Sequence, residues 1–155
     1  MRSMHHTLTI VIPALNEQEA IGSTIERCLA SAERIKQIGG VDRVEIVVVS
    51  DGSTDRTAEI AQSYEKLHQD VTVVVFEKNR GYSAAIKEGW RIGTGDLLAF
   101  LDADGTCDPT YFAEMCRVAI DESADVVLGS RLGPDSKMPR IRRLGNRVYA
   151  FLLGL

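Results

Sequence analysis

The sequence predicts an α/β protein with a mostly parallel, doubly wound sheet and helices on both of its faces. Short runs rich in β-branched residues alternate five times with stretches in which apolar residues recur at helical spacing. The apolar runs are continuous rather than alternating, which is typical of strands that are covered on both faces. The length of 155 residues, with 45% hydrophobic residues, 26% charged residues and 4 prolines, suits one globular domain.

The first half of the chain is expected to form two strands, each followed by a helix. The stretch TLTIVIPAL predicts a buried strand that ends at Pro13. A helix should follow, with Asn16 and Glu19 as a capping box and a stop at Gly39 and Gly40. Its apolar face is predicted from helical spacing at Ile21, Ile25, Cys28, Ala32 and Ile35. VEIVVVS then predicts a second strand, and DGSTDRT a turn into a helix that Ser53 or Thr54 caps.

The second half continues the alternation. VTVVVFE predicts a strand, YSAAIKEGWRI a helix and DLLAFLD another strand. Asp108 and Pro109 should open a helix that runs to about Glu122, because proline is favoured at the first helical position. The run ADVVLGS, residues 124–130, predicts a fifth strand.

Residues able to bind a ligand cluster where these strands are predicted to end. In open α/β sheets ligands bind beyond the carboxyl ends of the strands. PALNE, SDGSTD, DADGT and GSRLG all lie at such ends. The sequence therefore predicts one binding site along this edge of the sheet.

Asp102 and Asp104 are the candidates for a metal site. They directly follow the fourth predicted strand, and residues two apart on an extended segment point the same way. Carboxylate oxygens suit Mg²⁺ or Mn²⁺, which proteins often share with substrate phosphates. On spacing alone a solvated turn with helix-capping acids is the better interpretation, and the position at the end of a strand is what favours the metal site. Asp51, at the end of the second strand, could likewise accept a hydrogen bond from a nucleotide base or only cap its own turn.

Several function classes are disfavoured by what the sequence lacks. It contains neither a Gly-x-Gly-x-x-Gly fingerprint nor a Walker sequence, which argues against dehydrogenases and P-loop NTPases. PALNEQEA lacks the glycine-rich loop expected of a sugar-phosphate nucleotidyltransferase. The net charge of −4 does not suggest nucleic-acid binding. Three sparse cysteines, Cys28, Cys107 and Cys116, form no disulfide framework and suggest a reducing compartment.

The chain divides into three parts by composition. Residues 1–7 are a leader of no assigned function, residues 8–136 the expected domain, and residues 137–155 a basic and apolar segment. That segment has five basic residues and no acidic one: Lys137, Arg140, Arg142, Arg143 and Arg147. Such a segment suits an anionic membrane surface, the start of a spanning helix or pairing with another copy, although an ordinary amphipathic helix has the same pattern.

Four stretches resemble the family 2 glycosyltransferases with the A-type nucleotide-sugar fold, in order and in spacing. They are VIPALNEQEAI, EIVVVSDGSTDRT, NRGYSAAIKEGWRIGTGDLLAFLDADGTCDP and GSRL. Within that family they look most like the polyprenyl-phosphate sugar synthases, such as the dolichyl-phosphate mannose synthases. The likeness covers roughly residues 8–155, although the family usually continues further, so a C-terminally truncated fragment is expected.

The resemblance implies a role for each matching position. Asp102 and Asp104 match the family's Asp-x-Asp motif, which binds the sugar and the divalent ion that bridges the diphosphate. Arg131 matches an arginine near the diphosphate or acceptor, and Thr106 stands where the synthases usually have glutamine. The positions that match the nucleotide-binding residues are Pro13, Ala14, Glu17, Asp51 and Ala103.

The function that follows is an inverting, metal-dependent transfer of a sugar from a UDP- or GDP-sugar to an acceptor. A polyprenyl phosphate is the expected acceptor, because no general base is evident downstream of Asp104. A phosphate is already ionised at neutral pH and needs no base, whereas a saccharide hydroxyl does. Truncation of the chain would explain the lack of a base equally well. The protein would then act on the cytoplasmic side of a membrane. The alternatives are transfer to a saccharide hydroxyl and a nucleotide-sugar-binding domain without turnover.

Overall fold

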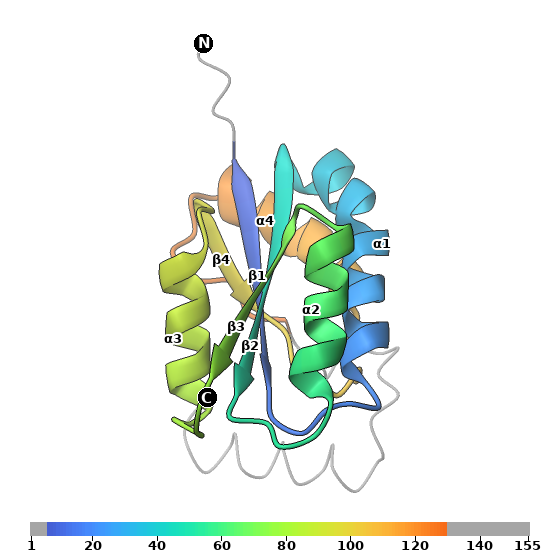
Figure 1. The fold of residues 1–155 in the computed structure, drawn as a ribbon. Helices are drawn as coiled ribbons and strands as arrows, with labels where there is room; N and C mark the ends of the chain where they lie inside the picture. The colour runs from blue at the N-terminus through green and yellow to red at the C-terminus, as the bar shows by residue number, and fades with distance from the viewer. Residues whose placement is uncertain (1–5, 130–155) are drawn as a thin grey trace, which may run out of the picture.

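The computed structural model describes residues 6–129 of the chain. Strands and helices alternate along it in the predicted order (Figure 1). The elements are β1 (Thr7–Ala14), α1 (Ile21–Gly39), β2 (Arg43–Asp51), α2 (Thr57–Leu67), β3 (Val71–Phe76), α3 (Tyr82–Ile92), β4 (Leu97–Phe100), the 3₁₀ turn η1 (Pro109–Tyr111) and α4 (Phe112–Asp121). Arg131 and residues 137–155 lie outside the described residues.

Within residues 6–129 the sheet has four strands in the order β3-β2-β1-β4. Every neighbouring pair is parallel, and β1 and β2 pair along their whole length from Thr7 with Arg43 to Ala14 with Ser50. The strand order reverses direction between β1 and β4, which is the point where doubly wound sheets bind ligands. The predicted fold class is confirmed.

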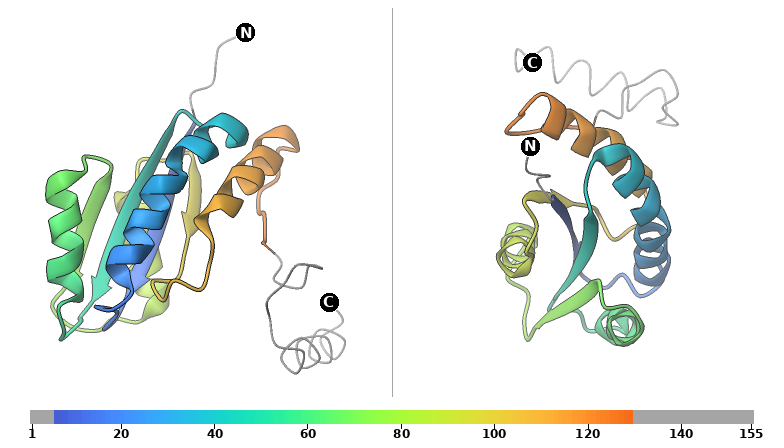
Figure 2. Two further views of the ribbon diagram at one scale, coloured as in Figure 1. Left: turned by 90° about the vertical axis from the view of Figure 1, so that its right-hand side faces the viewer. Right: turned by 90° about the horizontal axis from the view of Figure 1, so that it is seen from above.

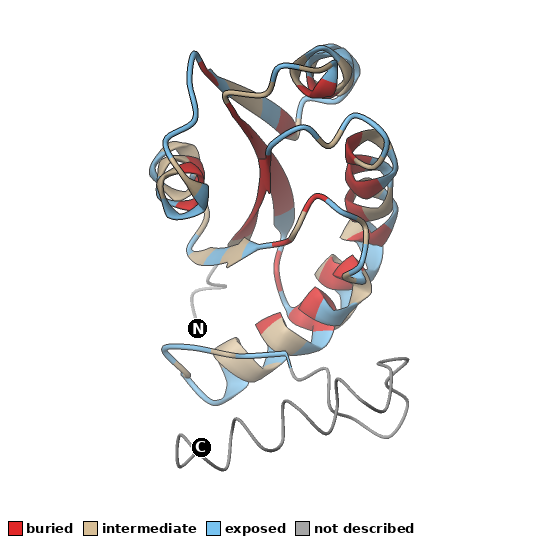
Figure 3. Cartoon of the chain, turned by 90° about the horizontal axis from the view of Figure 1, so that it is seen from below, coloured by how far each residue is buried: buried red, intermediate tan, exposed pale blue. Residues whose placement is uncertain are grey.

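Helices cover both faces of the sheet (Figure 2), and one apolar core lies on each face. Successive side chains of β1 alternate between them: Ile10 and Ile12 face α1, α2 and α4, while Val11 faces α3. The central strands are buried on both sides (Figure 3), as their continuous apolar sequences predicted. Gly40, at φ 70°, ends α1 in the left-handed conformation that glycine favours.

The predicted strand at residues 124–130 is wrong for the part that the structure describes. Residues 124–129 pair with no strand, and Val126 and Leu128 are 73% and 86% exposed. A parallel strand exists only through its ladder to a neighbour, so an apolar run predicts a strand without ensuring that it pairs. No helix among residues 6–129 has both the length and the apolar character needed to cross a membrane.

Candidate active site

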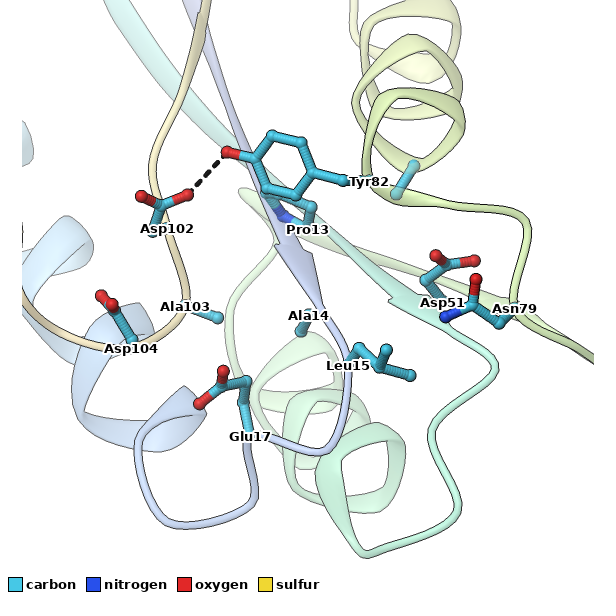
Figure 4. A pocket seen from close by; sticks show the side chains of 11 residues that line it. Pro13, Ala14, Leu15, Glu17, Asp51, Asn79, Tyr82, Asp102, Ala103 and Asp104 are labelled. Carbon is cyan, nitrogen blue, oxygen red and sulfur yellow. Dashed lines mark hydrogen bonds between the residues drawn. The ribbon is translucent and has the colours of Figure 1, made fainter. Parts of the chain in front are cut away.

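A pocket opens at the carboxyl ends of β1, β2 and β4 (Figure 4). It contains all of the predicted site residues that the structure describes: Pro13, Ala14, Glu17, Asp51, Asp102, Ala103 and Asp104. Four further residues line it that the sequence did not single out: Leu15, Asn79, Tyr82 and Ala85. Asp51 and Asn79 lie at one end of the pocket and the Asp102–Asp104 loop at the other, with Pro13 and Ala14 between them.

The loop after β1 is fixed by hydrogen bonds to the loop after β2. The Asn16 side-chain oxygen accepts the backbone N–H of Thr54 at 2.8 Å, and the backbone N–H of Glu17 donates to the Thr57 hydroxyl at 2.8 Å. The predicted capping box is therefore wrong: α1 begins at Ile21 without a side-chain cap. Asn16, at φ 56°, instead accepts a hydrogen bond from the turn after β2, and this contact holds the backbone that leads to Glu17.

Asp51 is both a wall of the pocket and an anchor for the turn before α3. It is 4% exposed, and its two carboxylate oxygens accept the backbone N–H groups of Arg80 at 2.7 Å and Gly81 at 2.9 Å. The two turns pack closely, since a Cβ on Gly52 would lie 2.3 Å from the backbone nitrogen of Asn79. A carboxylate can accept about four hydrogen bonds, so these two leave capacity for a donor from a ligand.

The acidic loop beyond β4 brings Asp102 and Asp104 to the same side of the pocket. One oxygen of Asp104 accepts the backbone N–H of Thr106 at 2.9 Å and its hydroxyl at 2.8 Å. Thr106 thus orients Asp104. Among residues 6–129 no group of three or more His, Cys, Asp or Glu side chains could hold a metal. Two carboxylates nevertheless suit Mg²⁺ or Mn²⁺, because such ions commonly complete their shell with substrate phosphates and water.

Helix α1 holds the backbone of this acidic loop. The buried hydroxyl of Thr24 donates to the carbonyl of Ala103 at 3.0 Å. The guanidinium of Arg27 donates to the carbonyls of Gly105 at 2.7 Å and Cys107 at 2.8 Å. The sequence carried one signal for these contacts, namely two polar residues three apart beside the apolar face of the helix.

Tyr82 is the pocket residue that the sequence missed and that contacts a predicted metal ligand. Its hydroxyl donates to Oδ1 of Asp102 at 2.6 Å. Partial burial of this half-exposed side chain and the hydrogen bond to the Asp102 carboxylate raise the pKa of Tyr82 above its usual range. The hydroxyl is therefore protonated at neutral pH and acts as a hydrogen-bond donor.

Solved structures share this architecture. TarS of S. aureus, residues 1–349, superposes with a TM-score of 0.63 at 18% identity, over 83% of this chain and 40% of that one. The mannosyltransferase PcManGT from Pyrobaculum calidifontis, in complex with GDP-Man and Mn²⁺, gives a TM-score of 0.59 at 25% identity, over 74% of this chain and 33% of that one. The A-type fold expected from the sequence is confirmed.

Curated relatives are similar at the level of sequence. A dolichyl-phosphate beta-glucosyltransferase of Drosophila melanogaster is 36% identical over 134 residues, covering 80% of this chain and 40% of the relative. An undecaprenyl-phosphate 4-deoxy-4-formamido-L-arabinose transferase of Photorhabdus laumondii is 32% identical over 121 residues, covering 77% of this chain and 35% of the relative. The chain thus spans well under half the length of these proteins.

The resemblance to polyprenyl-phosphate sugar transferases that the motifs indicated is confirmed by these relatives. The family model described as Glycosyl transferase family 2 matches residues 9–153, which is nearly the whole sequence. The chain belongs to glycosyltransferase family 2.

Proposed function

We propose that this domain binds a UDP- or GDP-sugar together with a divalent cation and transfers the sugar, with inversion, to a polyprenyl phosphate. One observation carries the proposal: a single pocket at the strand ends has Asp51 at one end and the Asp102–Asp104 pair at the other. A nucleotide-diphosphate sugar has a base at one end and an anionic diphosphate nearer the other. The pocket offers a hydrogen-bond acceptor for the first and cation ligands for the second.

The Asp51 end is proposed to hold the nucleoside. Uracil and guanine each present a ring N–H, which the Asp51 carboxylate can accept in addition to its two backbone donors. The side chain of Asn79 lies beside Asp51 (Figure 4) and can donate to a base carbonyl. Pro13, Ala14 and Leu15 form an apolar surface between the two ends, and the half-buried Glu17 offers a carboxylate to the ribose hydroxyls.

The Asp102–Asp104 end is proposed to hold the diphosphate through Mg²⁺ or Mn²⁺. When bound, such an ion supplies positive charge that stabilises the departing nucleoside diphosphate. The chain contributes the orientation of the two carboxylates: Thr106 fixes Asp104, while Thr24 and Arg27 fix the loop backbone. The PcManGT complex with GDP-Man and Mn²⁺, at 25% identity, supports this assignment.

The proposed acceptor is a lipid phosphate. Its oxygen would attack the anomeric carbon from the face opposite the departing diphosphate, and it needs no general base because it is already ionised. The relatives named for dolichyl phosphate and undecaprenyl phosphate support this choice. Arg131, which lies outside the described residues, is proposed from the family resemblance to neutralise charge near the diphosphate or acceptor.

Residues 137–155 are proposed to place the domain at the cytoplasmic surface of a membrane. Each cation near anionic head groups contributes roughly 1 kcal/mol, so the five together could retain the domain there. The test is co-sedimentation with anionic vesicles, comparing the full chain with one that stops before Lys137. Equal binding of both at low and high salt would contradict the membrane proposal and favour a soluble saccharide acceptor.

The function itself is tested in two steps with the full chain. Calorimetry against UDP- and GDP-sugars, with and without Mn²⁺, should show binding of one nucleotide class that the metal strengthens. A transfer assay with a polyprenyl phosphate should then show turnover. Metal-strengthened binding without turnover would instead support a nucleotide-sugar-binding domain, and binding of neither nucleotide would overturn the proposal.

A further inference from the structure

We propose that Tyr82 is a positioning residue of the donor site, whose hydroxyl holds Asp102 in the orientation needed for the cation and diphosphate. The inference rests on the proposed function, since it concerns the same pocket. Its starting point is the 2.6 Å hydrogen bond from the Tyr82 hydroxyl to Oδ1 of Asp102. Figure 4 shows the second carboxylate oxygen of Asp102 turned away from the tyrosine.

The Tyr82 ring is itself held by a row of aromatic side chains. It meets Phe100 edge-on, with centroids 6.3 Å apart and planes at 86°. Phe100 meets Trp90 at 6.3 Å and 61°, and the Trp90 indole N–H donates to the carbonyl of Ala99 at 3.1 Å. Edge-to-face contacts of this kind are favourable beyond the area that they bury. These contacts thus fix the Tyr82 hydroxyl, at the start of α3, relative to the loop after β4 that contains Asp102.

The backbone before Tyr82 is held by the other end of the pocket. Asp51 accepts the N–H groups of Arg80 and Gly81, directly before the first residue of α3. Tyr82 therefore connects the proposed base-binding carboxylate to a proposed metal ligand through one short segment. This is the physical reason to expect that Tyr82 affects how the metal and the nucleotide bind together.

The chemistry of a phenol suits this position better than that of a cation. Asp102 and Asp104 line the same pocket, and the Tyr82 hydroxyl donates to Asp102 without bringing a charge of its own. A lysine or arginine at position 82 could also donate to that carboxylate, but its positive charge would repel Mg²⁺ or Mn²⁺. The neutral hydroxyl of Tyr82 orients Asp102 and leaves the site negative.

The experiment is calorimetry with the full chain, in which Mn²⁺ is titrated at a fixed concentration of UDP or GDP, whichever the wild type binds. Tyr82→Phe keeps the ring and removes the hydroxyl. We expect the Mn²⁺ concentration for half-maximal nucleotide binding to rise about tenfold, the scale of one charge-assisted hydrogen bond. Nucleotide affinity without metal should stay within about twofold of wild type. Tyr82→Lys should raise the Mn²⁺ requirement further, because it adds a competing positive charge.

The matched control is Tyr111→Phe, the same change at an exposed tyrosine of η1 that does not line the pocket. It should leave both measurements unchanged. An unaltered Mn²⁺ requirement in Tyr82→Phe would overturn this inference and leave the proposed function standing. An equal loss of affinity with and without metal would also overturn it, because Tyr82 would then be only a wall of the pocket. A wild type without Mn²⁺-dependent nucleotide binding would remove the proposed function and the inference together.

Discussion

The two ends of the parallel sheet use carboxylates in opposite ways. At the amino end, Glu45 of β2 is 8% exposed and surrounded by donors from its own chain. The Thr9 hydroxyl on β1 donates to it, as do the backbone N–H and the hydroxyl of Thr94 in the loop between α3 and β4. The backbone N–H of Gly95 donates a hydrogen bond to the Thr9 hydroxyl and completes the cluster. A Cβ at position 95 would lie 2.5 Å from that hydroxyl oxygen, so a side chain does not fit there.

At the carboxyl end, acidic side chains line an open pocket instead. Asp51 resembles Glu45 in accepting backbone N–H groups, but it also faces the pocket, and Asp102 and Asp104 lie across from it. The amino end of the sheet thus has a closed, hydrogen-bonded cluster, and the carboxyl end has a pocket that a ligand can enter. We expect substitutions at the amino end to change unfolding more than nucleotide binding, and substitutions at the carboxyl end to do the reverse.

The largest effect on nucleotide binding is expected for Asp104→Asn. The amide keeps an oxygen that can accept from Thr106 but removes the charge that a cation needs. Mutating a residue that only hydrogen-bonds to a metal ligand typically lowers metal affinity or activity by about 10–100-fold. For a direct ligand we therefore expect the Mn²⁺-dependent affinity for UDP or GDP to fall by about 100-fold. Calorimetry measures the affinity, and the thermal unfolding midpoint should stay close to that of wild type.

Asp96→Asn is the matched control for Asp104→Asn. Asp96 is an exposed aspartate near the amino end, and it accepts the backbone N–H of Thr7 at 3.0 Å. The same chemical change there should leave nucleotide affinity unaltered. Equal losses in the two variants would show that net charge, rather than the position in the pocket, controls binding.

Asp51→Ala should have the next largest effect. It should weaken binding of the nucleotide-sugar donor by about 1–3 kcal/mol, the scale for leaving a polar partner unpaired. The backbone amides of Arg80 and Gly81 lose their acceptor in the same variant, so their hydrogen exchange should accelerate. Asp51→Asn, which keeps one acceptor oxygen, should fall between wild type and alanine. Lower fold stability with intact donor affinity would show that Asp51 is a turn residue only.

The predicted site residues that line the pocket could be found from the sequence because their signals are local. They lie at the end of an apolar run or within a few positions after it, so finding the strand also locates them. The contacts that orient these residues join distant parts of the chain and left little local trace. Tyr82 and Asp102 are 20 positions apart, and Arg27 lies 78 and 80 positions from the carbonyls that it binds. Asn16 was wrongly expected to cap the next helix, since its partner Thr54 is 38 positions away.

A smaller effect is expected for Arg27→Ala, which tests the support of the acidic loop. Arg27 touches only backbone carbonyls there, at Gly105 and Cys107, so its loss should loosen the loop without removing a ligand. We expect Mn²⁺-dependent nucleotide affinity to fall about fivefold to tenfold, and Arg27→Lys to restore part of it through one donor. Arg34→Ala, at an exposed arginine of the same helix, is the control. No difference between the two alanine variants would mean that Arg27 has no part in holding the site.

The smallest effect on nucleotide binding, and a clear effect on stability, is expected for Glu45→Gln. Burial alone would raise the pKa of Glu45, but the hydrogen bonds from Thr9 and Thr94 outweigh it and hold the pKa below the ordinary 4.5. The charged form therefore stabilises the fold above pH 4.5, and this contribution is lost as the pH falls through the lower folded-state pKa. Glutamine keeps the shape but removes the charge, so the free energy of unfolding at pH 7 should fall by roughly 1–3 kcal/mol.

The difference in the free energy of unfolding between wild type and Glu45→Gln should then become smaller below pH 4.5. Denaturant unfolding measured between pH 7 and 3 would detect this change. Glu33→Gln, at an exposed glutamate of α1, should change stability little at any pH. Nucleotide affinity at pH 7 should be the same in both variants and in wild type, because Glu45 lies at the opposite end of the sheet from the pocket. A loss of affinity in Glu45→Gln as large as that in Arg27→Ala, with stability unchanged, would contradict the division of roles between the two ends.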